Sequence, residues 1–206
     1  MMPCKRPAPP EVLTSDRVDE WTARFNKPND QGALPEFRWP TVDGQTLNKH
    51  LLPALRSMTV DHCAYCDAWP AEELAESIDH FRPKSKFREL AFAWSNLFPA
   101  CPACQKAKSD DWDERALCPT EHDYSFDRYF EFRVDTGAIV PRADASKVDQ
   151  ERAEFSIEFL ASIDPADAVL DSSVSRCAAF TQGSLTSPAK TGRIAFSAER
   201  AARAND

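Results

Sequence analysis

The sequence lacks a hydrophobic run long enough to cross a membrane. No apolar stretch approaches the roughly 18 residues that a spanning helix needs, and the first ten residues, MMPCKRPAPP, lack the apolar core of a signal peptide. We therefore expect no membrane association and a cytoplasmic location. Internal repeats are absent too, so the 206 residues suit one domain, or one small domain with extensions.

Positive charge is scarce as well. The chain has 25 Lys and Arg against 33 Asp and Glu, which gives a formal net charge of −8. This balance argues against a free-standing protein that binds nucleic acid tightly and without specificity. A protein of this charge that acts on nucleic acid needs a local basic patch, a partner, or both.

Four of the seven cysteines form two pairs with the spacing Cys-x2-Cys. In a reducing compartment, paired motifs of this kind hold zinc more often than they form disulfides. A redox-active pair or a chance spacing is the alternative, and the presence of a second pair weakens both. We expect a tetrahedral structural Zn²⁺ site made by Cys63, Cys66, Cys101 and Cys104. The other three, Cys4, Cys118 and Cys177, are interpreted as small apolar residues.

We divide the chain into four sections. Residues 1–60 contain a proline-rich arm, RPAPP, and two helices whose apolar residues recur at helical spacing (Val18, Trp21 and Phe25; then Leu47, Leu51, Leu55 and Met58). Pro53 is expected to kink or restart the second helix. Residues 119–165 are expected to form a hairpin over Arg128–Pro141 and a helix over Val148–Leu160. Residues 166–206 are rich in Ser, Ala and Thr, and a loosely ordered tail is predicted there.

Residues 61–118 hold both cysteine pairs. Within them we predict a strand at HCAYC (residues 62–66) that enters a tight turn, a strand over Ser77–Phe81 that Pro83 ends, and a short helix that starts at the second pair. Asp79 and His80 lie between the two pairs, so a bound zinc ion would hold them on a small rigid unit. A carboxylate that ligates a divalent cation, beside a neutral imidazole that accepts a proton from water, suits metal-assisted phosphodiester hydrolysis.

The segment from His80 to Ser109 is basic in an acidic chain. It contains six Lys or Arg residues and one acid, which gives a formal charge of +5. Such a patch is where a polyanionic phosphate chain would bind, and the alternative is an ordinary solvated face. We take as candidate phosphate contacts Arg82, Lys84, Lys106 and Lys108.

The order C-x2-C, I-D-H-F-x-P, W-x-N-L, C-x2-C-x3-K resembles the HNH (His-Me finger) endonuclease family. More narrowly, IDHFRPKS and its spacing to WSNLFPACPAC resemble the PtuB-like HNH subunit of retron-associated and Septu anti-phage systems. The resemblance covers about residues 5–160. It implies an α+β fold with a small ββα-metal core and Cys4 zinc knuckles, flanked by N-terminal helices and a C-terminal hairpin plus helix.

The resemblance also implies a role for each matching residue. His80 is similar to the general base, and Asp79 to a ligand of a catalytic Mg²⁺ or Mn²⁺; the other interpretation of Asp79 is that it fixes the His80 tautomer. Asn96 matches an asparagine that orients the loop and the histidine, or is a simple turn residue. Gln105 stands where the family commonly has Asn or His as the second metal ligand, and is either a ligand or a bystander.

Three functions remain open at this point. The first is a nuclease that cuts DNA, working with the SMC/ABC-type ATPase that accompanies PtuB-like proteins, and with the RPAPP arm and the flanking helices as part of that contact. The second is the same nuclease acting on RNA, such as tRNA. The third is a zinc-stabilised interaction module without catalysis, which the unusual Gln105 favours.

Overall fold

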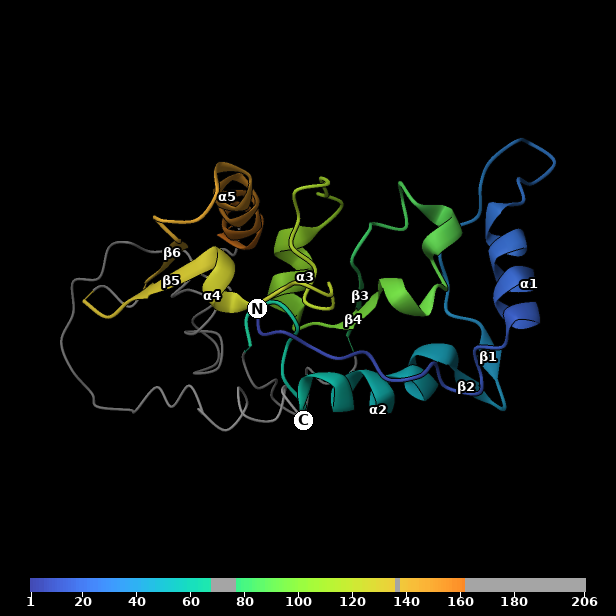
Figure 1. Ribbon diagram of the computed structural model, residues 1–206. Coiled ribbons are helices and arrows are strands. Elements are labelled where there is room, and N and C mark those ends of the chain that lie inside the picture. Colours follow the sequence, from blue (N-terminus) through green and yellow to red (C-terminus); the bar gives the residue numbers. More distant parts are fainter. Residues whose placement is uncertain (68–76, 136–137, 162–206) are drawn as a thin grey trace.

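The computed structural model describes residues 1–67, 77–135 and 138–161. Its helices and short strands follow one another along an elongated body (Figure 1). Helix α1 lies at one end, the C-terminal hairpin and helix α5 lie at the other, and the central strands lie between them. The expected tail over residues 166–206 and the centre of the expected hairpin turn at 136–137 fall outside the described residues.

The N-terminal section packs two amphipathic helices against the central section, α1 against the turn at residues 88–90 and α2 against the strand at residues 97–99. It consists of α1 (Ser15–Asn26), the short strands β1 (Thr41–Val42) and β2 (Gln45–Thr46), and α2 (Leu47–Thr59). Trp21 and Phe25 of α1 are buried, and α2 buries the leucines that its periodicity predicts. Pro53 lies inside α2, and the helix continues through it without restarting.

The central section begins after α2 with turns, so at HCAYC the predicted tight turn is present, at residues 64–66, and the predicted strand is wrong. Val60 and Asp61 before this segment and Asp67 after it have positive φ angles of 52°, 60° and 58°, and the Asp67 amide closes the turn by donating to the Cys63 carbonyl at 3.0 Å. The first strand here is β3 (Ile78–His80), followed by the 3-10 turns η2 (Arg88–Leu90) and η3 (Trp94–Asn96), β4 (Leu97–Pro99) and α3 (Pro102–Lys108). Strands β3 and β4 pair antiparallel, with Asp79 opposite Phe98 and His80 opposite Leu97.

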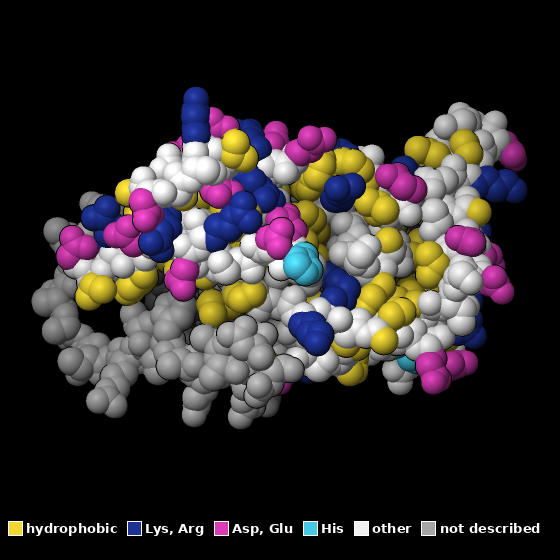
Figure 2. All heavy atoms as spheres, in the orientation of Figure 1, with side chains coloured by type: hydrophobic (Ala, Val, Ile, Leu, Met, Phe, Trp, Pro, Cys, Tyr) yellow, Lys and Arg dark blue, Asp and Glu magenta, His cyan; other side chains and the backbone are white. Residues whose placement is uncertain are grey.

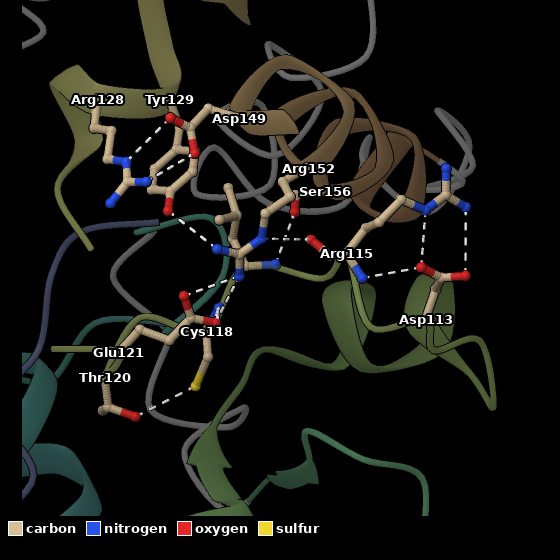
Figure 3. Close-up of polar contacts among 11 residues, drawn as sticks. Asp113, Arg115, Cys118, Thr120, Glu121, Arg128, Tyr129, Asp149, Arg152 and Ser156 are labelled. Atoms are coloured by element: carbon tan, nitrogen blue, oxygen red, sulfur yellow. Dashed lines mark hydrogen bonds and ion pairs between the residues drawn. The ribbon is translucent and has the colours of Figure 1, made fainter. Parts of the chain in front are cut away.

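The C-terminal section contains the predicted hairpin and helix. It consists of α4 (Phe126–Tyr129), β5 (Phe130–Arg133), β6 (Ala138–Pro141) and α5 (Lys147–Ala161), and β5 pairs antiparallel with β6. Arg152 of α5 fastens this section to the preceding loop: it donates to both carboxylate oxygens of Glu121 at 2.7 and 2.9 Å, and to the Tyr129 hydroxyl at 3.1 Å (Figure 3).

The proline-rich arm lies against the central section. Arg6 donates hydrogen bonds of 2.8 Å to the backbone carbonyls of Trp94 and Leu97, and its guanidinium lies 4.3 Å from the centre of the Phe98 ring. The Trp94 indole donates back to the Pro7 carbonyl at 2.9 Å. The arm therefore extends the packing around β4. None of the helices within the described ranges is long and apolar enough to cross a membrane.

Candidate active site and metal centre

The four predicted zinc ligands come together in the structure. Cys63 and Cys66 lie in the turn after α2, Cys101 caps the N-terminus of α3, and Cys104 lies within that helix. Their sulfur atoms are all within 4.8 Å of one another, and all four side chains are buried. Four thiolates at about 2.3 Å from a tetrahedral zinc ion are about 3.8 Å apart, and the Cys66 and Cys101 sulfur atoms are 3.8 Å apart. The cluster therefore fits a structural zinc site.

Backbone amides also point at these sulfur atoms. The Cys101 amide donates to the Cys63 sulfur at 3.3 Å, and the Cys104 amide donates to the Cys101 sulfur at 3.4 Å. Amide donors of this kind stabilise thiolates, which are the form that binds zinc. Zinc would join the turn after α2 to the start of α3, and so fix the elements on both sides of β3.

Tyr65 links this cluster to the candidate catalytic strand. It lies between Cys63 and Cys66 in sequence, its side chain is fully buried, and its hydroxyl donates a 2.6 Å hydrogen bond to the Asp79 carboxylate. Burial and the nearby Asp79 charge raise the pKa of Tyr65 well above its usual range, so the hydroxyl keeps its proton. Nothing in the motif pointed to this residue except its position inside the first cysteine pair.

Asp79 is 5% exposed and also contacts a buried lysine. The Lys108 ammonium is 3.2 Å from the Asp79 carboxylate and donates at 2.7 Å to the His80 backbone carbonyl. Burial raises the pKa of Asp79, and Lys108 and Tyr65 oppose that shift. A divalent ion bound by Asp79 would therefore share the carboxylate with Lys108 or replace it. Since Lys108 is 1% exposed, a phosphate reaches its ammonium only by displacing these partners.

His80 has different neighbours, because successive side chains of a strand point to opposite faces. Its imidazole stacks on Trp39 with ring centres 5.6 Å apart and planes inclined by 17°, and it meets Phe37 edge-on at 5.0 Å. The ring is 4% exposed beneath these two half-buried aromatics. Arg88 holds their segment in place by donating to the backbone carbonyls of Phe25 and Pro35.

The hydrogen bond of His80 determines its tautomer. Its Nε2 atom is 2.9 Å from the Ala91 carbonyl oxygen. Since a carbonyl only accepts, Nε2 carries the proton, and the neutral ring has its lone pair on Nδ1. Burial and the charge of Lys84 lower the pKa of His80 to about 3, so the ring is neutral at pH 7. Ala91, and not Asp79, orients this imidazole, so the interpretation of Asp79 as the tautomer-fixing partner is wrong.

Asn96 ties the loop after β3 to the turn before β4. Its side-chain oxygen accepts from the Arg82 amide at 2.8 Å, and its side-chain nitrogen donates to the carbonyls of Arg82 and Leu90 at 3.0 and 3.2 Å. These bonds fix residues 82–90. This loop includes the candidate phosphate contacts Arg82 and Lys84 and ends beside Ala91, whose carbonyl accepts a hydrogen bond from His80. Asn96 thus positions the loop that leads to the hydrogen-bond acceptor of the imidazole.

Both ends of the Gln105 carboxamide have partners. Its oxygen accepts from the Ser77 hydroxyl at 2.5 Å, and its nitrogen donates to the Ile78 carbonyl at 3.1 Å. Gln105 thereby joins α3 to the start of β3. To ligate a cation, the oxygen has to accept the ion in addition to Ser77 or in its place.

The remaining candidate phosphate contacts lie closer to the surface than Lys108. The Arg82 guanidinium lies over the Trp112 ring at 5.0 Å, and the Lys84 ammonium lies over the Phe37 ring at 5.2 Å. Arg82 and Lys106 are exposed, and Lys84 is half-buried. The charges of Lys84 and Lys108 act on both Asp79 and His80. Positive charge therefore reaches both candidate catalytic residues, although their side chains have different neighbours.

The central section of the chain is similar to a known protein family. The family model of HNH endonuclease matches residues 63–111. The matched segment contains both cysteine pairs, β3, β4 and α3, and with them Asp79, His80 and Asn96. The comparison with curated proteins gave no match. The family match supports the assignment of this central segment to the HNH endonuclease family.

Proposed function

We propose that the protein is a metal-dependent endonuclease with a ββα-metal active site on β3, β4 and α3, and that it hydrolyses phosphodiester bonds in DNA. The observation that carries the proposal is the hydrogen bond from His80 Nε2 to the Ala91 carbonyl. It leaves Nδ1 as an unprotonated base, on the strand that also holds Asp79. A general base typically contributes about 10²–10⁴-fold to a rate when its pKa lies near the operating pH, so the burial that lowers the pKa of His80 to about 3 has to be relieved before the reaction.

In the proposed reaction, His80 Nδ1 accepts a proton from water and the resulting hydroxide attacks phosphorus. The bond from phosphorus to the leaving oxygen then breaks. Asp79, with Gln105 as the second candidate ligand, would hold a Mg²⁺ or Mn²⁺ ion, which supplies charge stabilisation at the phosphate and the leaving oxygen when bound. Tyr65 orients the Asp79 carboxylate, and the zinc site has a structural role only.

Because neighbouring aromatic rings cover His80, the proposed cleavage requires a conformational change. A phosphate does not reach a ring that is 4% exposed, so cleavage requires the segment that carries Phe37 and Trp39 to move away from the imidazole. This segment precedes β1, and Arg88 holds it through a hydrogen bond to the Pro35 carbonyl. We propose that substrate or a partner provides this opening.

We further propose that the protein is the nuclease subunit of an anti-phage defence complex and works with an SMC/ABC-type ATPase. Two observations favour this: the resemblance of IDHFRPKS and WSNLFPACPAC to PtuB-like proteins, and the net charge of −8, which makes DNA capture by the isolated protein poor. Within this proposal, the RPAPP arm and the flanking helices form part of the contact with the ATPase.

A second candidate function is a zinc-stabilised interaction module without catalysis. The engaged Gln105 carboxamide, the Lys108–Asp79 ion pair and the covered His80 favour it. The two candidates differ in their dependence on divalent ions, because a binding module cuts nothing under any ionic condition.

The experiment compares cleavage of supercoiled DNA, linear duplex DNA, single-stranded DNA and tRNA by the zinc-loaded protein. Each substrate is tested with Mg²⁺, with Mn²⁺ and with no added divalent ion, in the presence and absence of the ATPase. We expect DNA cleavage that requires Mg²⁺ or Mn²⁺ and increases with the ATPase. Cleavage of tRNA alone reassigns the substrate, and the absence of cleavage in every combination favours the interaction module.

A further inference from the structure

A groove lies in the N-terminal section, between α1 and residues 35–41. Its volume is about 540 Å³, within the roughly 300–1,000 Å³ of ligand-binding pockets. Four aromatic side chains and two cations that line it matter for its chemistry: Trp21, Phe25, Trp39, Phe92, Arg24 and Arg38. In the space-filling view, hydrophobic side chains lie at the surface between the central strands and α1, and both basic and acidic side chains lie around them (Figure 2).

The aromatic residues of the groove form one connected wall. The Phe92 ring centre is 5.9 Å from that of Trp21, 6.3 Å from that of Phe25 and 6.4 Å from that of Trp39. Trp21, Phe25 and Phe92 are buried, whereas Trp39 is half-buried. Trp39 is thus the wall residue with the most ring surface available to a bound molecule.

The arginines at the groove suit a ligand whose anionic group is attached to an aromatic ring. Arg24 and Arg38 are exposed, and neither forms an ion pair with a described residue. Glu36 is the single acid of the lining, so the lining carries a net positive charge. Aromatic side chains with nearby arginines are how proteins hold single-stranded nucleic acid, because every base has a face for stacking and every nucleotide carries a phosphate.

The groove adjoins the candidate general base through one side chain. Trp39 lines the groove, and the same indole stacks on the His80 imidazole at 5.6 Å. A base held against this wall would therefore contact the side chain that covers His80. Its strand would be anchored beside the candidate catalytic residue.

We infer that this groove binds an unpaired base of a DNA strand, with the base against the aromatic wall and its neighbouring phosphates at Arg24 and Arg38. The inference rests on the proposed nuclease function for its choice of DNA, but its test does not depend on cleavage. It adds to that function a preference for DNA with an unpaired nucleotide, such as a single strand or a flipped-out base.

The test measures binding by the full-length, zinc-loaded His80→Ala protein without added Mg²⁺ or Mn²⁺, so that the DNA stays intact. The probes are a fluorescent single-stranded DNA of about 12 nucleotides, within the roughly 4–16-nucleotide footprint of single-strand-binding folds, the same strand with abasic residues, the matching duplex, and the RNA of the same sequence. We expect the base-containing DNA strand to bind at least about fivefold more tightly than the abasic strand, since stacking contributes about 5–150-fold per base. We also expect it to bind more tightly than the duplex and the RNA.

Variants in the same His80→Ala background locate the site. Trp39→Ala should remove the difference between the base-containing and abasic strands. Arg24→Ala and Arg38→Ala should each reduce the slope of log affinity against log salt concentration by about 0.7, the value expected for one lost phosphate contact on a single strand. Arg17→Ala, an exposed arginine of α1 outside the groove lining, is the matched control and should leave the slope unchanged.

Equal affinity for the base-containing and abasic strands overturns the inference, and so does an equal effect of Arg17→Ala and the two groove variants. Tighter binding of the duplex overturns the preference for an unpaired base, and tighter binding of RNA overturns the choice of DNA. The arginine variants decide the result if Trp39→Ala does not fold. If the protein cleaves DNA but binds the base-containing and abasic strands equally, only this inference is wrong. If it binds the base-containing strand more tightly but cleaves no substrate, only the proposed nuclease function is wrong.

Discussion

The Tyr65 hydroxyl donates a 2.6 Å hydrogen bond to the Asp79 carboxylate, and both side chains are buried. Tyr65 lies between two of the four clustered cysteines, whereas Asp79 lies on the strand that carries the candidate general base. The bond therefore connects the zinc-binding turn to the candidate active site. A zinc ion in the four-cysteine cluster could thereby position a candidate catalytic group.

Tyr65→Phe should destabilise the protein by about 1–3 kcal/mol, since it leaves a buried carboxylate with one donor fewer. Zinc content should stay at one ion per chain, because no cysteine is changed. Urea unfolding and metal analysis measure the two effects. In a double-mutant cycle with Asp79→Asn, the two changes should be non-additive. Strict additivity would show that the two side chains are not coupled in solution.

Cys104→Ser should lose the zinc ion and with it most of the stability of the central section. Structural zinc sites contribute about 10–16 kcal/mol of apparent binding free energy at pH 7, which exceeds the total stability of many domains. Cys118→Ser is the control, because this thiol lies outside the four-cysteine cluster. Metal content and thermal unfolding should distinguish the two variants. Equal zinc loss in both would contradict the assignment of the ligands.

Two arginines of the C-terminal section should differ in their contribution to stability. Arg152 is half-buried and bonds Glu121 and Tyr129 (Figure 3), so Arg152→Ala should cost about 1–3 kcal/mol through unpaired groups. Arg142 forms a solvent-exposed ion pair with Asp144 and donates to the Asp127 carbonyl, and Arg142→Ala should lower the unfolding free energy less than Arg152→Ala does, because solvent screens the pair. Equal losses in urea unfolding would show that Arg152 does not hold α5 in place.

The lowered pKa of His80 makes stability depend on pH. Between pH 6.5 and about 3 the unfolded chain binds a proton at His80 that the folded protein does not. The unfolding free energy therefore falls as the pH is lowered through this window, by up to about 1.4 kcal/mol per pH unit. His80→Gln removes this titration and should show a flatter dependence between pH 6.5 and 5. Zinc release affects both proteins alike, so identical slopes would mean that His80 is not enclosed.

Sequence spacing predicted those structural features that are determined by residues close together in the chain. Two Cys-x2-Cys pairs predict one metal cluster, and the helical spacing of Trp21 and Phe25 predicts the buried face of α1. The alternation around Asp79 predicts β3. In these cases a few neighbouring residues determine the outcome.

Long-range packing was not predictable in this way. No local pattern indicates that Trp39, about 40 residues before His80, stacks on its ring. Lys108 appeared as one more cation of a basic patch, but the fold buries it against Asp79. The turn around Cys63 and Cys66 replaces a predicted strand, because the backbone bends so that the Asp67 amide donates to the Cys63 carbonyl.

The central claim is that His80 removes a proton from the attacking water, and one comparison tests it most directly. Single-turnover DNA cleavage is measured for the wild type, His80→Ala and His122→Ala, each loaded with zinc and supplied with Mg²⁺ or Mn²⁺ and the ATPase. His122 is exposed and lies outside the family-matched segment. We predict a loss of about 10²–10⁴-fold in His80→Ala, with unchanged zinc content, and no loss in His122→Ala. Equal cleavage rates in the wild type and His80→Ala would contradict the account.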